Sequence, residues 1–239
     1  MRQKLIMVLV LGISLIISSI VFGTFFYQSR QPEKTIRVVG AATQRFGSDI
    51  IKWRITITRN TGINDLNKGF ELIRQDRMNL TEILKKNGVD EKSISIQPVN
   101  TNPIYNQYER PSNPTGYNIQ QNIFVISKDV DTIEQFALDP SELVEKGIVI
   151  QSSNLEYYSS RLSEIKRELL AEATKDARRR AEEIAKSSGD RIRQIVSARV
   201  GVFQITEPFS TEVSDYGIYN SATREKDITV TVNVVFNLK

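Results

Sequence analysis

The sequence predicts an α+β fold in which two repeated β-α-β-β units, with long helices packed on antiparallel or mixed sheets, follow an N-terminal membrane helix. Three observations lead to this prediction. Apolar residues recur every three or four positions from Arg161 to Ser188, which is the period of one helix face. From Asp227 to Leu238, apolar and polar residues alternate as they do in a strand with one buried face. The same order of elements also occurs twice along the chain, as in an internal repeat.

The composition excludes several classes of chemistry. The chain has 239 residues, a net charge of +4, and neither cysteine nor histidine. Thiolate nucleophiles, iron–sulfur clusters and disulfides are therefore excluded. Ser-His-Asp catalysis and the zinc, copper or haem sites that need imidazole or thiolate are excluded as well. The small net charge does not indicate a nucleic-acid-binding protein.

An apolar segment opens the chain. Arg2 and Lys4 precede the run Leu5–Phe26, which as a helix is long enough to cross about 30 Å of hydrocarbon. We expect an uncleaved anchor rather than a signal peptide, because the best cleavage site, Val21-Phe22-Gly23, is poor. Basic residues before the run predict a cytoplasmic N-terminus. We therefore expect residues 1–34 to be a signal anchor and linker in the inner or plasma membrane, with a single pass and the body in the periplasm or another extracytoplasmic space.

The first half of the domain 35–239 is predicted to contain strands and one long helix. The expected strands are 35–40, 50–58, 93–99 and 117–127, with a turn at Gly47-Ser48-Asp49 and an exposed hairpin end at 100–114. The helix is expected over 64–87, because Gly88 is a typical helix stop. Its inner face is predicted to be Leu66, Phe70, Ile73, Leu80 and Leu84.

The second half is predicted to add two short helices, one long helix and three strands. Asp139-Pro140 separates the short helices 130–137 and 141–146, because a residue before proline resists the helical conformation. The strands are expected at 148–158, 192–206 and 227–238, with a loop of exposed aromatic residues at 207–220 between the last two. The long helix 161–188 is expected to bury Leu162, Ile165, Leu169, Ala173, Ala177, Ala181 and Ile184.

The repeated order suggests a duplication, with units at about 50–127 and 148–238. Each unit reads as strand, helix, glycine stop, strand, hairpin and strand, and the helix stops are Asn87-Gly88 and Ser188-Gly189. The alternative, that an α+β protein repeats this order by chance, stays open. From its middle onward the second helix buries only alanine, so we expect it to approach its neighbour closely.

Several segments, in this order, resemble one known family. They are Ile36-Arg-Val-Val-Gly40, Ser48-Asp49, Asn87-Gly88 followed by Ile94–Val99, Gly116-Tyr117, Lys146–Ile150, and the helix with Ala173, Ala177, Ala181 and Ala185 that ends at Ser188-Gly189. Over residues 35–239 the chain resembles the SIMPL-domain family, whose exported bacterial members include periplasmic immunogenic proteins. The sequence departs from the family pattern at Gly47-Ser48, where a proline is common before the aspartate, and at Trp53, where a small residue is usual.

The resemblance implies an exported α+β protein with a duplicated unit. It also implies assembly into ring-like homo-oligomers and a link to envelope or oxidative-stress phenotypes. The family has no established catalytic residues, so no catalytic, cofactor-binding or metal site is assigned to this chain, and no cofactor is expected.

Three groups of residues are the chemical candidates. Arg178-Arg179-Arg180 is interpreted as a solvated helix face, with pairs such as Asp176 with Arg180 and Arg179 with Glu183. Tyr157, Tyr158, Tyr105, Tyr108, Tyr216 and Tyr219 form either an aromatic recognition surface or ordinary loop packing. The pairs Ser127-Lys128 and Lys186-Ser187 are adjacent in sequence, which sends their side chains to different faces.

The sequence therefore predicts a non-enzymatic, membrane-anchored extracytoplasmic protein that forms a homo-oligomeric envelope assembly with a stress-related role. Its expected partners are the membrane, through the N-terminal helix, and further copies of itself, but not nucleic acid. The alternative is an envelope ligand-binding module or a hydrolase that uses Ser/Lys or carboxylate groups.

Overall fold

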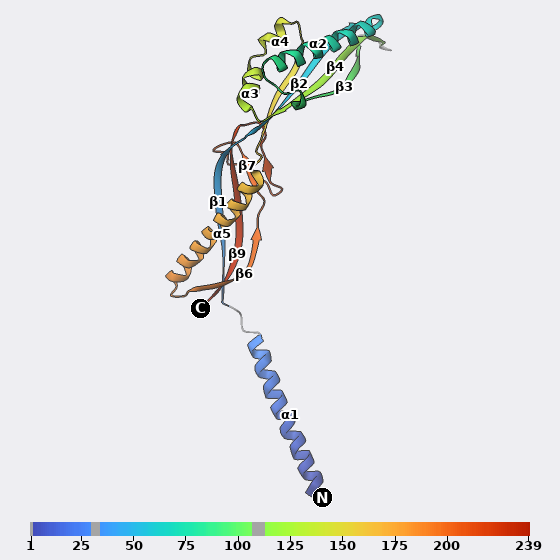
Figure 1. Cartoon of the computed structure of the whole chain (residues 1–239). Helices are drawn as coiled ribbons and strands as arrows, with labels where there is room; N and C mark the ends of the chain where they lie inside the picture. The colour runs from blue at the N-terminus through green and yellow to red at the C-terminus, as the bar shows by residue number, and fades with distance from the viewer. Residues whose placement is uncertain (1, 30–33, 107–112) are drawn as a thin grey trace. The chain divides into compact units, whose positions relative to one another are not determined.

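The computed structural model describes residues 2–29, 34–106 and 113–239 (Figure 1). The helices are α1 (Arg2–Ser29), α2 (Leu66–Lys86), α3 (Val130–Leu138), α4 (Ser141–Glu145) and α5 (Leu162–Ser187). The strands are β1 (Thr35–Gly47), β2 (Ile50–Gly62), β3 (Ile94–Tyr105), β4 (Pro114–Ser127), β5 (Ile150–Tyr158), β6 (Ile192–Val200), β7 (Gln204–Thr206), β8 (Ile218–Tyr219) and β9 (Glu225–Leu238). Two sheets and long helices confirm the α+β class.

The chain divides into two compact units. Unit 1 comprises Met1–Gly40, Thr174–Val200 and Val232–Lys239, and unit 2 comprises Ala41–Ala173 and Gly201–Thr231. The division passes through β1, α5 and β9, so these three elements contribute residues to both units.

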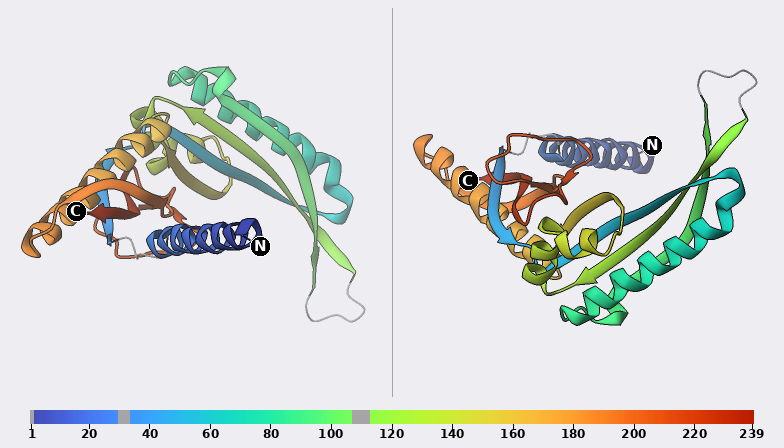
Figure 2. Two further views of the ribbon diagram at one scale, coloured as in Figure 1. Left: turned by 90° about the horizontal axis from the view of Figure 1, so that it is seen from below. Right: turned by 90° about the horizontal axis from the view of Figure 1, so that it is seen from above.

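Unit 2 contains an antiparallel sheet of four strands in the order β3-β4-β2-β5. Helix α2 packs on β2 and β4, and α3 packs on β2 and β5. Figure 2 shows α2 lying along this sheet. The alternation predicted for β2 is confirmed, because Ile51, Trp53, Ile55 and Ile57 are fully buried. Trp53 fits this core: its Nε1 donates to Ser153 Oγ at 2.8 Å, and its ring lies 6.1 Å from that of Phe136.

The inner face of α2 differs from the predicted one at one position. Phe70 is 40% exposed, while its neighbour Gly69 is buried. The helix comes so close to the sheet at Gly69 that a Cβ there would collide with Ile119 and Thr61. The prediction counted only large apolar residues and therefore chose Phe70. Where α2 comes closest to the sheet, the buried position has to be a glycine, because a side chain does not fit there.

A buried ion pair holds α2 against β2. Asp76, on the inner face of α2, is only 3% exposed. Arg59 of β2 donates to it through Nε at 2.6 Å and Nη2 at 2.7 Å, and Nη2 also donates to Gly147 O at 2.6 Å. The guanidinium thereby joins the sheet, the helix and the turn after α4.

The second sheet has the order β1-β9-β7-β8, with β6 paired to β9. In unit 1, β6 and the end of β9 are antiparallel from Val200↔Val232 to Ile192↔Leu238. In unit 2, β7 pairs with β9 and with β8. The alternation of β9 is confirmed, with Ile228, Val230, Val232, Val234 and Phe236 all buried.

Two predicted features of the second half are corrected. The single strand 192–206 is divided into β6 and β7 by residues 201–203, and at Gly201 the chain runs so close to β9 that a Cβ would lie 2.6 Å from Thr231 Oγ1. The proposed unit 148–238 does not form a sheet of its own, because β5 pairs with β2. The elements of the first unit occur in the predicted order, but the duplication stays a prediction.

Helix α5 buries Ile165, Leu169, Ala173, Ala177, Ala181 and Ala185. Ile184, predicted to be inside, is 52% exposed. The buried positions recur every four residues, and since a residue turns by about 100°, each step of four rotates the stripe by about 40°. The accumulated rotation places Ala185, rather than Ile184, on the buried face.

Helix α1 confirms a helix over the apolar run at the N-terminus. Among the residues that the structure describes, no helix is both long and apolar enough to span a membrane. Of the predicted linker and hairpin end, residues 30–33 and 107–112 lie outside the described residues.

Candidate functional site

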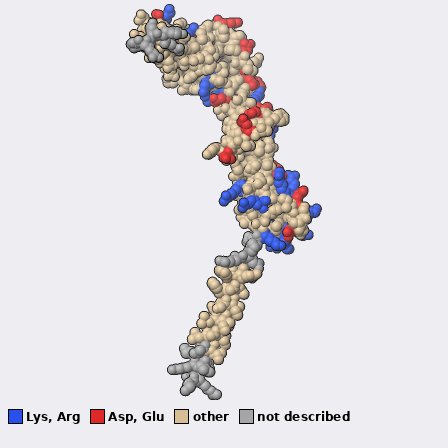
Figure 3. All heavy atoms as spheres, turned by 180° about the vertical axis from the view of Figure 1, so that it is seen from behind, with Lys and Arg blue, Asp and Glu red and all other residues tan. Residues whose placement is uncertain are grey.

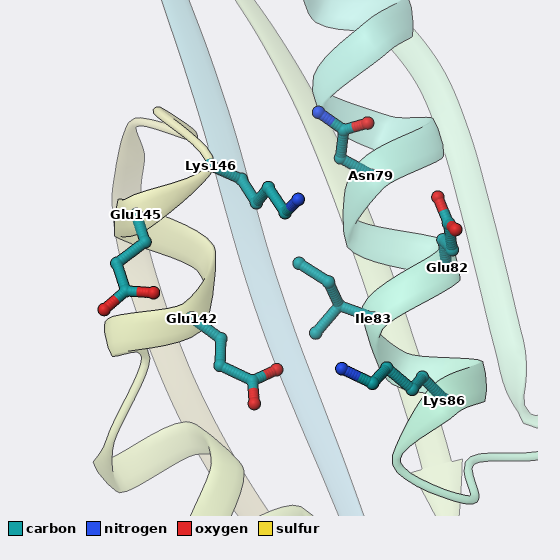
Figure 4. Close-up of a pocket in the computed structure, with 7 residues that line it drawn as sticks. All are labelled: Asn79, Glu82, Ile83, Lys86, Glu142, Glu145 and Lys146. Atoms are coloured by element: carbon teal, nitrogen blue, oxygen red, sulfur yellow. The ribbon is translucent and has the colours of Figure 1, made fainter.

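A groove of about 330 Å³ lies between α2 and α4 (Figure 4). Its lining residues are Asn79, Glu82, Ile83, Lys86, Glu142, Glu145 and Lys146. Lys86, Lys146 and Glu142 point into the space between the two helices. Asn87 Nδ2 donates to Glu142 Oε2 at 3.3 Å. The lining contains lysine and glutamate but no serine, so this groove holds no Ser/Lys centre, which is one of the two forms of the hydrolase alternative.

A lysine at the start of β9 is completely buried, which strongly perturbs its titration. Lys226 has no exposed surface, and its Nζ donates to Thr223 O and lies 5.8 Å from the ring centroid of Tyr157. Burial lowers the pKa of Lys226 from 10.5 to about 8. A lysine with a lowered pKa is a better nucleophile. The complete burial of Lys226, however, leaves a substrate no access to its Nζ.

Tyr157, which lies near Lys226, belongs to a group of polar contacts that also includes Glu134 and Arg224. Tyr157 donates its OH to Glu134 Oε1 at 2.6 Å, and burial together with this bond raises the pKa of Tyr157. Arg224 Nη1 lies 3.2 Å from Glu134 Oε2 and 2.6 Å from Asp131 Oδ1. Ser48 N donates to Arg224 O at 3.0 Å, yet the buried Ser48 Oγ has no hydrogen-bond partner. These contacts tie α3 and the β1–β2 turn to the start of β9.

The Ser48-Asp49 segment has a structural role. Asp49 Oδ1 accepts from Ser160 N at 2.7 Å, and Oδ2 accepts from the Ser160 hydroxyl. Burial alone would raise the pKa of Asp49, but the hydrogen bonds from Ser160 lower it overall. Asp49 thus fixes the β1–β2 turn to the residues just before α5.

The two Ser-Lys pairs use their hydroxyls for local structure. Ser127 Oγ accepts from Asp129 N at 3.0 Å, and Ser187 Oγ donates to Glu183 O at 2.9 Å. Lys128 and Lys186 are both exposed. Neither pair lines the groove between α2 and α4.

The arginine triplet is part of a solvated helix face, as predicted. Arg178 lies 2.9 Å from Glu182, and Arg180 lies 2.7 Å from Asp176. Arg179 pairs with Asp176 at 3.5 Å rather than with Glu183. All three arginine side chains are more than half exposed, so the charges of this face are largely satisfied within the helix.

The tyrosines do not form one surface. Tyr216 is 98% exposed, and Tyr105 and Tyr219 are also exposed, but Tyr157 is buried. Tyr158 is half-buried, stacks on Tyr219 with ring centroids 6.1 Å apart, and donates to Glu156 at 2.7 Å. That bond, with burial, raises the pKa of Tyr158 to about 12. Tyr108 lies outside the described residues.

Three exposed apolar surfaces remain. Helix α1 exposes large apolar side chains along its described length. Strand β6 exposes Ile195, Val196 and Val200, and pairs along one edge only, with β9, in the part of the chain described. The loop after β7 exposes Phe209 by 86%. Within the described ranges, no group of three or more carboxylates is placed to hold a metal ion.

Sequence reasoning missed Lys226 because it began the last strand at Asp227. The alternation of Ile228, Val230 and Val232, extended one step back, places Lys226 on the same buried face. The alternation in β4 also identifies Gln121, which lies between the buried Ile119 and Ile123 and therefore on the same buried face. A polar residue at a position where the alternation of a strand predicts a buried side chain was therefore the sequence signal for both residues.

Comparison with known proteins finds one family model that covers most of the chain. Residues 36–236 match a family model described as "SIMPL: Protein of unknown function (DUF541)". No curated protein matches the sequence. The matched range runs from the start of β1 to near the end of β9, so it includes both sheets and the helices α2 to α5. The chain therefore belongs to the SIMPL (DUF541) family.

Proposed function

We propose that this protein is a non-enzymatic, extracytoplasmic SIMPL-domain protein, that its apolar N-terminal run Leu5–Phe26 anchors it in the inner or plasma membrane, and that it assembles with copies of itself in the cell envelope. Its partners are the lipid bilayer and further copies of the chain, without nucleic acid. A role in envelope stress belongs to the same proposal.

The observation that carries the proposal is the uncovered apolar surface of α1. Leu15, Phe22 and Phe25 are 66%, 71% and 72% exposed. On the face that Figure 3 shows, the tan part of this helix carries neither acidic nor basic side chains. Such a surface is unfavourable in water and is relieved by burial in hydrocarbon or against another apolar surface. This supports a membrane anchor, and with the positive residues Arg2 and Lys4 it supports an exported body.

Self-assembly is supported by the edge of β6. A strand edge without a partner presents free backbone donors and acceptors that another chain can pair with. On β6 this edge coincides with apolar side chains, because Ile195, Val196 and Val200 are each about half exposed. A natural edge strand that carries such side chains is more typical of an interface than of a surface in permanent contact with water.

The absence of catalysis is part of the proposal for two reasons. The most perturbed lysine, Lys226, is inaccessible, and the groove of Figure 4 combines lysine with glutamate without a nucleophilic hydroxyl. Neither arrangement meets the geometry that nucleophilic catalysis needs, which is a nucleophile and a base within hydrogen-bond reach in an open site.

Fractionation of cells that express the full chain tests the anchor. We expect the wild-type protein to stay in the membrane pellet after alkaline carbonate extraction, with its body open to protease only from the extracytoplasmic side. Leu15→Lys with Phe22→Lys should release it, since a lysine at a helix centre opposes insertion by about 3 kcal/mol. Leu15→Ala with Phe22→Ala is the matched control. A wild-type chain that carbonate extracts as readily as the lysine variant would refute the anchor.

Light scattering of the full chain in detergent tests the assembly. We expect a discrete protein mass several times the 27.2 kDa of one chain. A single 27.2 kDa species at all concentrations would refute self-assembly. Unchanged survival of a deletion strain under peroxide and envelope stress would remove the stress role.

A further inference from the structure

A second groove runs between α2 and the edge strand β3. One hollow of about 270 Å³ is lined by Phe70, Glu71, Ile73, Arg74, Arg77, Val99 and Gln121. A neighbouring hollow of about 590 Å³ shares Arg77 and is lined further by Met78, Thr81, Glu82, Lys85 and Ile96. Together they form what we call the Gln121 groove. The groove lies beside β3, the outer strand of its sheet, which among the described residues pairs only with β4. In other proteins such a strand edge accepts extended peptides.

Gln121 supplies an unused acceptor to this groove. It is only 3% exposed, and its Nε2 donates to Gln97 O at 2.8 Å, where β3 bulges between Ile96 and Val99. Its Oε1 has no hydrogen-bond partner. A buried acceptor without a partner is costly, so a ligand that donates an N–H here is favoured.

The other lining groups define the rest of the ligand. Arg74 and Arg77 make no ion pair with any described residue, and a carboxylate is the natural partner for a guanidinium. Phe70 and Met78 are 40% and 53% exposed along the same groove. A ligand that matches these groups carries an N–H donor, an apolar side chain and a carboxylate. An acidic peptide segment with one large apolar residue has all three.

The chain itself displays such a segment at Glu207–Gly217, which we call the Phe209 loop. Phe209, Val213 and Tyr216 are 86%, 82% and 98% exposed. The loop carries Glu207, Glu212 and Asp215, and no lysine or arginine occurs between Arg199 and Arg224. The three acidic residues of the loop are opposite in charge to Arg74 and Arg77. They are also opposite to the net charge of +1 that Glu71, Arg74, Arg77, Glu82 and Lys85 give the groove.

The loop is held in shape before any partner binds. Phe209 has a φ of 65°, which is unusual for a residue with a side chain. Its N–H donates to Asp227 Oδ2 at 3.3 Å, and the Arg45 guanidinium lies 4.4 Å from its ring centroid. Gln204 Nε2 donates to Ser214 O at 2.7 Å. A fixed, exposed aromatic side chain loses little freedom on binding, which is typical of an interface anchor.

We propose that the Phe209 loop of one copy docks in the Gln121 groove of a second copy. In this contact Phe209 or Val213 packs against the apolar side chains Phe70, Met78 and Val99. A backbone N–H of the loop donates to Gln121 Oε1. Glu212 and Asp215 form ion pairs with Arg74 and Arg77. This inference rests on the proposed self-assembly and specifies one of its contacts. Because the two surfaces differ, the contact is heterologous, and successive copies either close into a ring or extend as a filament.

Charge reversal and its compensation test the contact in the full chain in detergent, with mass measured by light scattering over a concentration series. We expect Phe209→Ala, and separately Arg74→Glu with Arg77→Glu, to weaken association by about tenfold or more, as the loss of an interface anchor does. Adding Glu212→Arg and Asp215→Arg to the reversed arginines should restore the wild-type mass. Leu138→Ala and Arg179→Glu, at exposed positions outside both surfaces, are the matched controls. Circular dichroism verifies that each variant is folded.

The outcomes separate this contact from self-assembly in general. A wild-type chain that is a monomer overturns both proposals. An oligomer that keeps its mass in the Phe209→Ala and arginine variants overturns the docking of this loop and leaves self-assembly standing. Arginine variants that dissociate without rescue by the compensating changes overturn the Phe209 loop as the occupant of the groove.

Discussion

Replacing Lys226 with methionine should stabilise the protein. The pKa of Lys226 is lowered from 10.5 to about 8 by burial, and each pKa unit corresponds to about 1.4 kcal/mol. Keeping the ammonium charged inside the fold therefore costs about 3 kcal/mol at neutral pH. Methionine has a similar length and no charge, but it loses the hydrogen bond to Thr223 O, which is worth about 1 kcal/mol. The net expectation for Lys226→Met at pH 7 is a gain of about 2 kcal/mol in the free energy of unfolding.

The stability of the wild-type protein relative to Lys226→Met should rise with pH. Below pH 8 the lysine is protonated in the folded and unfolded states, so the whole cost of burying its charge is present. Between about pH 8 and 10.5 the unfolded state binds more protons than the folded state, so wild-type stability rises with pH. Relative to Lys226→Met, the wild-type protein should therefore gain stability from pH 7 to pH 10.

Guanidinium unfolding of the full chain in detergent measures the difference at pH 7, 8, 9 and 10. Trp53 is the one tryptophan and is fully buried, so its fluorescence reports the loss of the core of unit 2. Comparing variant with wild type at each pH cancels the titration of the other groups. A methionine variant that is less stable at pH 7, or a difference that does not change with pH, would refute the reasoning about Lys226.

Two further predictions concern stability and use the same unfolding assay. Asp76→Ala should lower the free energy of unfolding by about 3–5 kcal/mol, because it leaves the partly buried Arg59 without its partner. Arg59→Met combined with Asp76→Leu should recover most of that loss, and a double variant as unstable as the single one would argue against a charge effect. Ala177→Leu should cost about 1–3 kcal/mol through overpacking of the fully buried stripe of α5. Arg179→Ala, at a side chain that is 72% exposed, should change the free energy by less than about 0.5 kcal/mol, and the reverse order would show that the orientation of α5 is wrong.

Periodicity predicted which elements form, but not always which side chain points inward. The strands β2 and β9 and the helices α2 and α5 occur where alternation and helical spacing predicted them. At Phe70 and Ile184, two adjacent positions competed for the buried face. Close approach of the sheet selected Gly69 instead of Phe70, and the rotation of the four-residue stripe selected Ala185 instead of Ile184. Such a choice depends on the distance between elements, which a single sequence does not contain.

The sequence also failed to predict which strands pair when they lie far apart in the chain. The sequence assigned β5 to the second repeat, whereas it pairs with β2 in the first sheet. A strand's own residues do not identify its neighbour, because pairing depends on contacts across the whole domain. For the same reason the candidate contacts of Gln121 and Arg74 emerged only from the structure, although the polar position within the apolar alternation of β4 was visible in advance.

The two ends of the body are joined, which affects how the chain folds during its synthesis. Leu238 N donates to Lys34 O at 2.8 Å, and β1, the first strand after α1, lies next to β9, the last. Contacts between residues so far apart in sequence form slowly, because a long loop must close before they contribute. The second sheet cannot be completed until the C-terminal residues have been synthesised, so β1 stays unpaired until then. Truncations that remove even the end of β9 should therefore expose β1 to aggregation or proteolysis.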